Sequence, residues 1–174
     1  AQVCSVAQDN VIIRDLLDNY SQTSERGRQL LNDLKDLDGF NWGYDPYAFN
    51  APEGSYATNP EDTSRIVEMR SMIQALHEMG LRASLDVVYN HTSSSGLWDN
   101  SVLDKIVPGY YHRLTTDTGE VLADSCCEDT ATENAMMAKL MKDTLVSWSA
   151  NFKFDAFRFD LMNLVMKEAM LEAR

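Results

Sequence analysis

The stretches Phe157-Arg158-Phe159-Asp160 and Asp86-Val87-Val88-Tyr89-Asn90-His91 decide the fold of this chain. Each belongs to an apolar or aromatic run that ends abruptly in charged and polar residues. Short apolar runs separated by helical patterns are typical of buried parallel strands in an α/β fold. We therefore expect strands over 81–88 and 154–159. Their polar residues should lie at the carboxyl ends, where parallel barrels carry their chemistry.

Arg158 and Asp160 lie two residues apart on the second expected strand. Side chains alternate along a strand, so both should point to the same face. The guanidinium of Arg158 can then hold the carboxylate of Asp160 ionised and oriented, as a nucleophile requires. The alternative is a structural Arg–Asp pair at the end of a strand.

Helical patterns flank both strands. One helix should follow Asn59 as its cap and Pro60 in its first turn, and should end at Gly80. Another should follow a capping box formed by Thr130 and Glu133. The expected apolar stripes are Ile66, Met69, Ile73, Leu76 and Met79 on the first helix, and Met137, Leu140, Met141, Leu145 and Trp148 on the second.

The rest of the chain divides into three stretches. Residues 1–39 form a poorly defined helical lead-in, with helical spacing over 11–17 and 30–37 around a polar run at 21–27. Residues 40–60 are rich in glycine, proline and aromatic residues, which predicts an ordered, irregular loop. The connection over 92–129 is long for a compact domain, and such loops are usually functional.

The composition is that of a globular protein, with 44% hydrophobic and 24% charged residues in 174. A net charge of −12 argues against nucleic acid as a partner, because phosphates require a basic footprint. A negative net charge is compatible with a neutral polysaccharide as the partner, although acidic residues can also serve solubility alone. We expect no membrane-spanning segment, because no apolar run approaches 18 residues. The oligomeric state is not predicted.

The cysteines and histidines outside the motifs predict little chemistry. Cys4, Cys126 and Cys127 are too few for a disulfide framework, and the adjacent pair would close only a strained ring. We therefore expect free thiols, and no spacing indicates a zinc site. His77 in a helix and His112 in a loop are expected at the surface.

The two strand motifs resemble the first two signature regions of glycoside hydrolase family 13, the α-amylase superfamily. Two further stretches are similar to its pullulanase and limit-dextrinase branch, which cleaves α-1,6 branch points. They are Asn41-Trp42-Gly43-Tyr44-Asp45-Pro46 and Pro52-Glu53-Gly54-Ser55-Tyr56-Ala57. Residues 101–108 and the pair Cys126-Cys127 add to the likeness, which covers roughly residues 40 to 174.

The resemblance implies an α/β fold that is part of a (β/α)₈ TIM barrel, with residues 40–174 as a fragment of the catalytic domain. Only two of its eight strands are recognisable. The general-acid glutamate and a later His-Asp pair of the family are expected beyond Arg174. We therefore expect the isolated chain to be inactive and poorly folded. The parent protein is expected to be secreted or displayed on the cell surface, although this chain carries no export signal.

The resemblance also assigns roles to site residues. It makes Asp160 the nucleophile, oriented by Arg158. It places Tyr44 under the reacting glucose and His91 on the sugar hydroxyls. The remaining substrate-binding residues are Asp45 and Trp42, and the residues that support the site from behind are Asp86 and Asn90.

The implied reaction is retaining hydrolysis of α-1,6-glucosidic branches in pullulan, starch or glycogen-type glucans. No cofactor is required. Asn90 matches a calcium-binding position of many α-amylases, but calcium and every other metal stay unassigned. The alternatives are another superfamily enzyme, such as an isoamylase or an α-amylase, and a catalytically inactive α-glucan-binding protein.

Overall fold

The computed structural model describes residues 5–6, 11–12, 17–21, 23–34, 43–98 and 100–174. The chain forms two compact units, Ala1–Trp42 and Gly43–Arg174. None of the helices in these described ranges is long and apolar enough to cross a membrane.

The described residues of the first unit include an antiparallel strand pair and a helix. Strand β1 (Ser5–Val6) pairs with β2 (Val11–Ile12), and helix α2 spans Glu25–Leu34. The expectation of a helix from residue 11 was wrong, because the β-branched pair Val11–Ile12 favours an extended backbone. Helix α2 also begins earlier than expected, within the polar run, where Glu25 complements the positive end of the helix dipole. Residues 13–16 and 35–37 lie outside the described residues.

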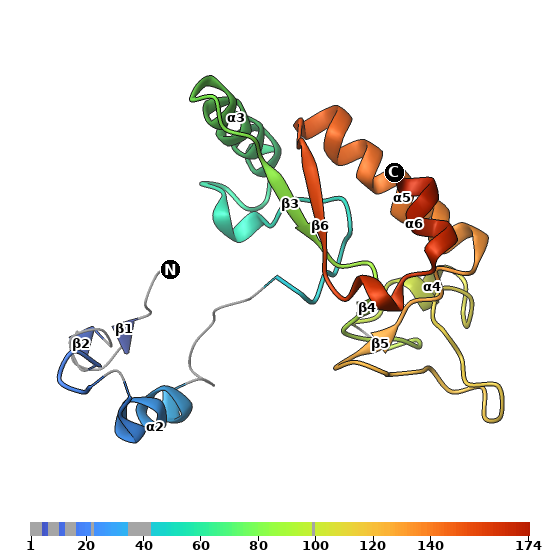
Figure 1. The fold of residues 1–174 in the computed structure, drawn as a ribbon, viewed down its shortest axis with the longest axis horizontal. Coiled ribbons are helices and arrows are strands. Elements are labelled where there is room, and N and C mark those ends of the chain that lie inside the picture. The colour runs from blue at the N-terminus through green and yellow to red at the C-terminus, as the bar shows by residue number, and fades with distance from the viewer. Residues whose placement is uncertain (1–4, 7–10, 13–16, 22, 35–42, 99) are drawn as a thin grey trace. The chain divides into compact units, whose positions relative to one another are not determined.

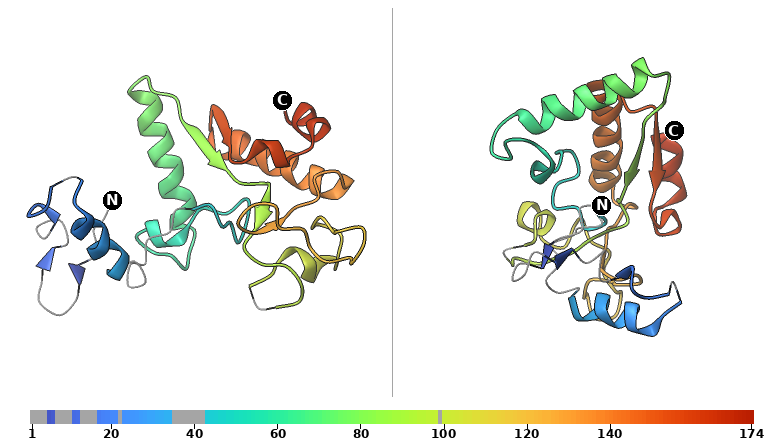
Figure 2. Two further views of the ribbon diagram at one scale, coloured as in Figure 1. Left: turned by 60° about the horizontal axis from the view of Figure 1, so that its bottom comes forward. Right: turned by 90° about the vertical axis from the view of Figure 1, so that its left-hand side faces the viewer.

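The second unit is organised around two parallel strands. Strand β3 (Ser84–Val87) pairs with β6 (Ala156–Phe159), with Ser84 opposite Ala156 and Val87 opposite Phe159. Both strands lie within the expected ranges and are shorter than predicted. Figures 1 and 2 show β3 and β6 side by side, with helix α5 (Ala135–Phe152) running along them in the crossover.

Helices cover one face of this two-stranded sheet. Leu85, Val87, Phe157 and Phe159 pack into two apolar clusters with α5, with helix α3 (Ser64–Glu78) and with helix α6 (Lys167–Ala173). The alternate strand residues, Ser84, Asp86, Ala156 and Arg158, are exposed. The sheet therefore has an apolar, covered face and a polar, open one.

The predicted apolar stripes pack largely as expected. Met137 and Met141 on α5 are fully buried, and Leu145 and Trp148 are nearly so. On α3, Ile73 is buried and three further members of the stripe pack against the same cluster: Ile66, Met69 and Leu76. Met79 is 66% exposed, because α3 ends at Glu78 and the chain turns away at Gly80, whose φ of +76° suits glycine.

The predicted starts of both helices were wrong. Helix α3 begins at Ser64, because Asn59 accepts a hydrogen bond from the Glu61 amide (3.1 Å) and so forms a turn before the helix. Helix α5 begins at Ala135. The two residues of the expected capping box have distant partners instead: the Thr130 hydroxyl donates to the Tyr89 carbonyl, and Glu133 accepts two hydrogen bonds from Arg113, both 2.8 Å.

The long connection between β3 and α5 is ordered by short elements. Strand β4 (His91–Thr92) pairs antiparallel with β5 (Glu128–Asp129), and the short helix α4 (Leu103–Ile106) lies between them. One-turn 3₁₀ helices, η2 (Gly54–Tyr56) and η3 (Met162–Leu164), occur before α3 and after β6.

A buried polar network holds this connection together. Asp104 accepts hydrogen bonds from the backbone amides of Gly96 (2.6 Å) and Gly109 (3.0 Å). His112 lies 2.8 Å from the Thr92 hydroxyl and 3.4 Å from Asp104. Burial acts to raise the pKa of Asp104, but the two amide bonds and His112 outweigh it and lower the pKa. The prediction that His112 lies at the surface was wrong: it is 1% exposed, because its Nε2 contacts the Thr92 hydroxyl and its Nδ1 lies near Asp104 inside this network.

Candidate active site

Arg158 joins two carboxylates at the carboxyl ends of the parallel strands. The strand register places Arg158 directly opposite Asp86. Its Nη1 donates to Asp86 Oδ1 at 2.9 Å and to Asp160 Oδ1 at 3.0 Å. The hydrogen bond to Asp86 is the main cause of a raised pKa of Arg158. The predicted placement of Arg158 and Asp160 on one face is therefore present in the structure.

Tyr44 extends this cluster from the preceding loop. Its hydroxyl donates to Asp86 Oδ2 at 2.9 Å, and its ring centroid lies 6.0 Å from Arg158 Cζ, within the range of a cation–π contact. The hydrogen bond to Asp86, followed by that carboxylate's charge, raises the pKa of the Tyr44 hydroxyl. A continuous chain of contacts thus runs from Tyr44 through Asp86 and Arg158 to Asp160.

The backbone around Asp160 is also well defined. Its amide donates to the Val87 carbonyl at 2.9 Å, which extends the β3–β6 ladder by one bond. The next residue, Leu161, has a φ of +41°, in the left-handed region that few residues other than glycine adopt. The chain therefore turns sharply immediately after Asp160, which leaves Asp160 at the end of the strand.

His91 and Asp45 form a second cluster in the same unit. His91 is buried, with Nδ1 2.7 Å from Asn90 Nδ2 and Nε2 3.5 Å from Asp45 Oδ1. Within the described part of the chain, His91 Nε2 and Asn90 Oδ1 make no hydrogen bond. The structure thus brings together His91, Asp45 and Asn90, to which the resemblance assigns roles in the site, whereas Trp42 lies outside the described residues.

Cys126 and Cys127 form a disulfide beside His91, so the expectation of free thiols was wrong. Cys127 Sγ lies 3.7 Å from Asp45 Oδ1. Sequence spacing could not reveal this neighbourhood, because the pair is distant in the chain from both residues. The only signal was the likeness of the Cys-Cys stretch itself.

Asp129 is a further site residue that the sequence analysis missed. It is fully buried, and it is the register partner of His91 in the β4–β5 ladder. Burial raises its pKa, and its Oδ1 makes no hydrogen bond to the rest of the described chain. No motif contains it, so its position is visible only in the structure.

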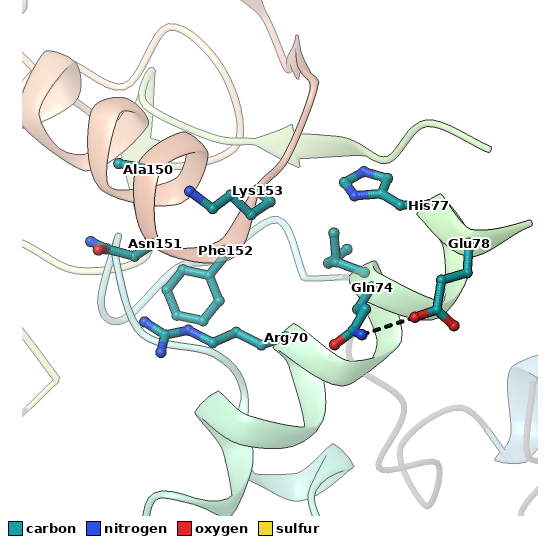
Figure 3. A pocket seen from close by; sticks show the side chains of 9 residues that line it. Arg70, Gln74, His77, Glu78, Ala150, Asn151, Phe152 and Lys153 are labelled. Carbon is teal, nitrogen blue, oxygen red and sulfur yellow. Dashed lines mark hydrogen bonds between the residues drawn. The ribbon is translucent and has the colours of Figure 1, made fainter. Parts of the chain in front are cut away.

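A groove lies elsewhere in the second unit. It has a volume of about 700 Å³ and is lined by the ends of α3 and α5, including Arg70, His77, Phe152 and Lys153 (Figure 3). These residues precede β3 and β6, so the groove is at the amino ends of the strands, opposite Asp160. There His77 contacts Asp155 at 2.8 Å, and His77 is exposed as predicted. We base the candidate site on the Arg158 cluster, because the groove's residues form structural contacts.

The chain is similar to known pullulanases. No family model matches it. It is 47% identical over 164 residues to a pullulanase of Klebsiella pneumoniae, which covers 93% of this chain and 15% of that protein. It is 44% identical over 160 residues to pullulanase 1, chloroplastic, of Arabidopsis thaliana, with 91% and 16% covered.

A solved structure gives the same result. The maltotriose complex of PulA from Klebsiella pneumoniae matches with a TM-score of 0.85 and 44% identity, covering 95% of this chain and 18% of that one. The chain spans about a sixth of the length of the curated relatives it matches. It is homologous to this segment of the pullulanases.

Proposed function

We propose, from this homology to a segment of the pullulanases, that the chain forms part of the active site of a retaining glycoside hydrolase. Its reaction is cleavage of α-1,6-glucosidic branches in pullulan, starch or glycogen-type α-glucans. One observation carries the proposal: Arg158 holds Asp160 at the end of a parallel strand, in a chain whose relatives are pullulanases.

Asp160 is the proposed nucleophile. It attacks the anomeric carbon and forms a covalent glycosyl intermediate, which water then hydrolyses. Arg158 orients the carboxylate and offsets its charge through the 3.0 Å hydrogen bond. The second carboxyl group of a retaining enzyme lies about 5–5.5 Å from the first and protonates the leaving oxygen. Asp86 is already bound to Arg158 and Tyr44, so we assign that proton donor to another part of the parent protein.

The sugar-binding role belongs to the residues around Asp160. The ring of Tyr44 offers a face for the C–H groups of glucose and for the positive charge of an oxocarbenium-like transition state. His91 Nε2 has no hydrogen-bond partner among the described residues and can bind a sugar hydroxyl. Asp45 lies beside it at 3.5 Å. Trp42 completes the set of predicted substrate-binding residues. A relative that matches the chain was solved with maltotriose bound.

A partial (β/α)₈ barrel is the architecture that we infer for the second unit. Two parallel strands joined by a helical crossover, with helices over one face, are the repeating unit of that fold. The open face carries Asp86 and Arg158, as expected for strands whose inner side faces a barrel interior. The division of the chain into a lead-in of residues 1–39 and a catalytic part of residues 40–174 stays part of the proposal.

Asp160→Asn in the complete parent protein tests the proposal. The amide matches the carboxylate in shape but is a poor nucleophile, so nearly all turnover of pullulan should be lost while glucan binding persists. Asp143→Asn, an exposed change on α5, is the matched control and should keep full activity. If Asp160→Asn retains a tenth or more of the rate, another residue attacks.

The same assay separates the alternatives. A higher rate on pullulan than on amylose supports debranching, and the reverse supports an α-amylase. An inactive glucan-binding protein would show no turnover in the wild type and equal binding in both variants.

A further inference from the structure

We propose that Cys126 and Cys127, once reduced, form with His91 a binding site for a thiophilic divalent cation such as Zn²⁺, with Asp45 as a fourth donor. The ligand atoms of Cys126, Cys127 and His91 all lie within 4.8 Å of one another. The site requires no glycosidase chemistry, so it stands independently of the proposed function.

The donor atoms have the number and type that zinc prefers. Structural zinc sites take four donors from Cys sulfur, His nitrogen and carboxylate oxygen, at about 2.0–2.3 Å in a tetrahedron. Donors on one ion are then roughly 3.3–3.8 Å apart. Asp45 Oδ1 is already 3.5 Å from His91 Nε2 and 3.7 Å from Cys127 Sγ. Small shifts of the two sulfurs would complete the tetrahedron.

His91 provides an independent indication of a ligand. The residue is 1% exposed, and its Nε2 has no hydrogen-bond partner in the described part of the chain. A buried ring nitrogen without a hydrogen bond lacks a favourable interaction, and a cation would supply one. Metal-bound histidines donate their other ring N–H to an oxygen. The Asn90 carboxamide lies 2.7 Å from Nδ1, and turning it would present its Oδ1, which is also unpartnered.

The disulfide closes the site, because the ligand form of cysteine is the thiolate. A dithiol reductant opens it by exchange through a mixed disulfide. The Cys126–Cys127 S–S bond breaks and two S–H groups form, while the reductant is oxidised to a cyclic disulfide. Zn²⁺ then displaces two thiol protons to solvent. Nearby Asp129, fully buried opposite His91, adds an acidic surrounding that favours a cation.

Ion binding has a consequence that rests on the proposed function. The cation would occupy His91 Nε2 and Asp45, which we assign to sugar hydroxyls. Glucan and metal would therefore compete, and only the reduced protein would be inhibited by zinc.

Zinc binding by the complete protein tests the site. It is measured by competition with a chromogenic chelator, before and after treatment with a dithiol. We expect one more Zn²⁺ per chain after reduction. Cys126→Ser, at an exposed position, and His91→Gln should each weaken that binding about tenfold or more. Asp117→Asn changes an exposed carboxylate of the same connection that is not a proposed ligand, and it is the control. Because the readout is binding, it does not depend on catalytic activity.

Two results would overturn the inference. The first is equal zinc uptake before and after reduction. The second is unchanged affinity in His91→Gln, which would reduce the site to two thiols. If His91→Gln fails to fold, the ultraviolet thiolate-to-metal absorption of Cd²⁺ decides: it should appear on reduction of the wild type and not in Cys126→Ser.

Discussion

Asp104→Asn should loosen the long connection that carries Cys126, Cys127 and Asp129 to the candidate site. Asp104 is 4% exposed, and its carboxylate accepts the amides of Gly96 and Gly109. Hydrogen bonds to a charged group contribute about 1.5–3 kcal/mol, against about 0.5–1.5 kcal/mol for neutral ones. The two amides bond different oxygens of the carboxylate, and asparagine keeps only one of them, since its NH₂ group donates and cannot accept. The change therefore loses one bond and leaves the other neutral, which should cost at least roughly 2 kcal/mol of local stability.

Hydrogen exchange of the complete protein measures this change. A loss of roughly 2 kcal/mol corresponds to about 30-fold faster exchange of amides over residues 92–129, since each 1.4 kcal/mol is about a factor of ten. Amides of α5 should change little, because their helix packs on the apolar core. Asp117→Asn is the matched control, since Asp117 is exposed in the same connection and accepts a hydrogen bond from the next amide.

The pH dependence gives a second check. The folded pKa of Asp104 is lowered, so its stabilisation is fully present above the unfolded pKa of about 3.9 and is lost as pH falls through the folded value. Wild type and Asp104→Asn should therefore converge in acid. Equal exchange in both proteins at neutral pH, or an equal effect of Asp117→Asn, would refute the anchoring role.

Further changes test the site and its support. Tyr44→Ala in the complete protein should lower kcat roughly tenfold or more with little change in glucan binding, whereas Tyr44→Phe keeps the ring and should have a mild effect. An equal loss of kcat in both variants would show that the hydrogen bond from the hydroxyl to Asp86 is what matters. Met141→Ala should lower the local stability of α5 by about 2–5 kcal/mol, since Met141 is fully buried. A loss under about 1 kcal/mol, measured by hydrogen exchange, would contradict this packing. Glu133→Gln should cost only about 1 kcal/mol at pH 7, because Glu133 is 39% exposed. Its pKa is lowered by Arg113, so the difference from wild type should shrink as pH falls from about 4.5 and be lost through the lower, folded pKa. A difference that does not shrink in acid would show that the charge is not the cause.

The sequence was sufficient for the features that rest on short-range periodicity. Strands β3 and β6, the buried stripe of α5 and the shared face of Arg158 and Asp160 all follow from the spacing of apolar and charged residues. Such spacing is local, and it fixes which residues of a parallel strand pair face the covering helices and which face outward.

Features that depend on distant partners could not be predicted. Thr130 and Glu133 match a capping box, but bonds to Tyr89 and Arg113 hold them elsewhere. His112 has no local pattern that marks it as buried, because the residues beside it, Thr92 and Asp104, are tertiary contacts. These errors share one cause: a side chain's strongest partner was far away in the sequence.

The parallel pairing of β3 and β6 has a consequence for synthesis. Ser84 faces Ala156, so 72 residues separate the paired positions. At about 5–20 residues per second, a ribosome would add that segment in roughly 4–14 s. During this interval β3 has left the synthesis site while its partner does not yet exist, and an unpaired apolar strand edge is open to wrong associations. Helix α5, made just before β6, can cover Leu85 and Val87 first, so we expect the order of synthesis to protect this edge of the nascent chain.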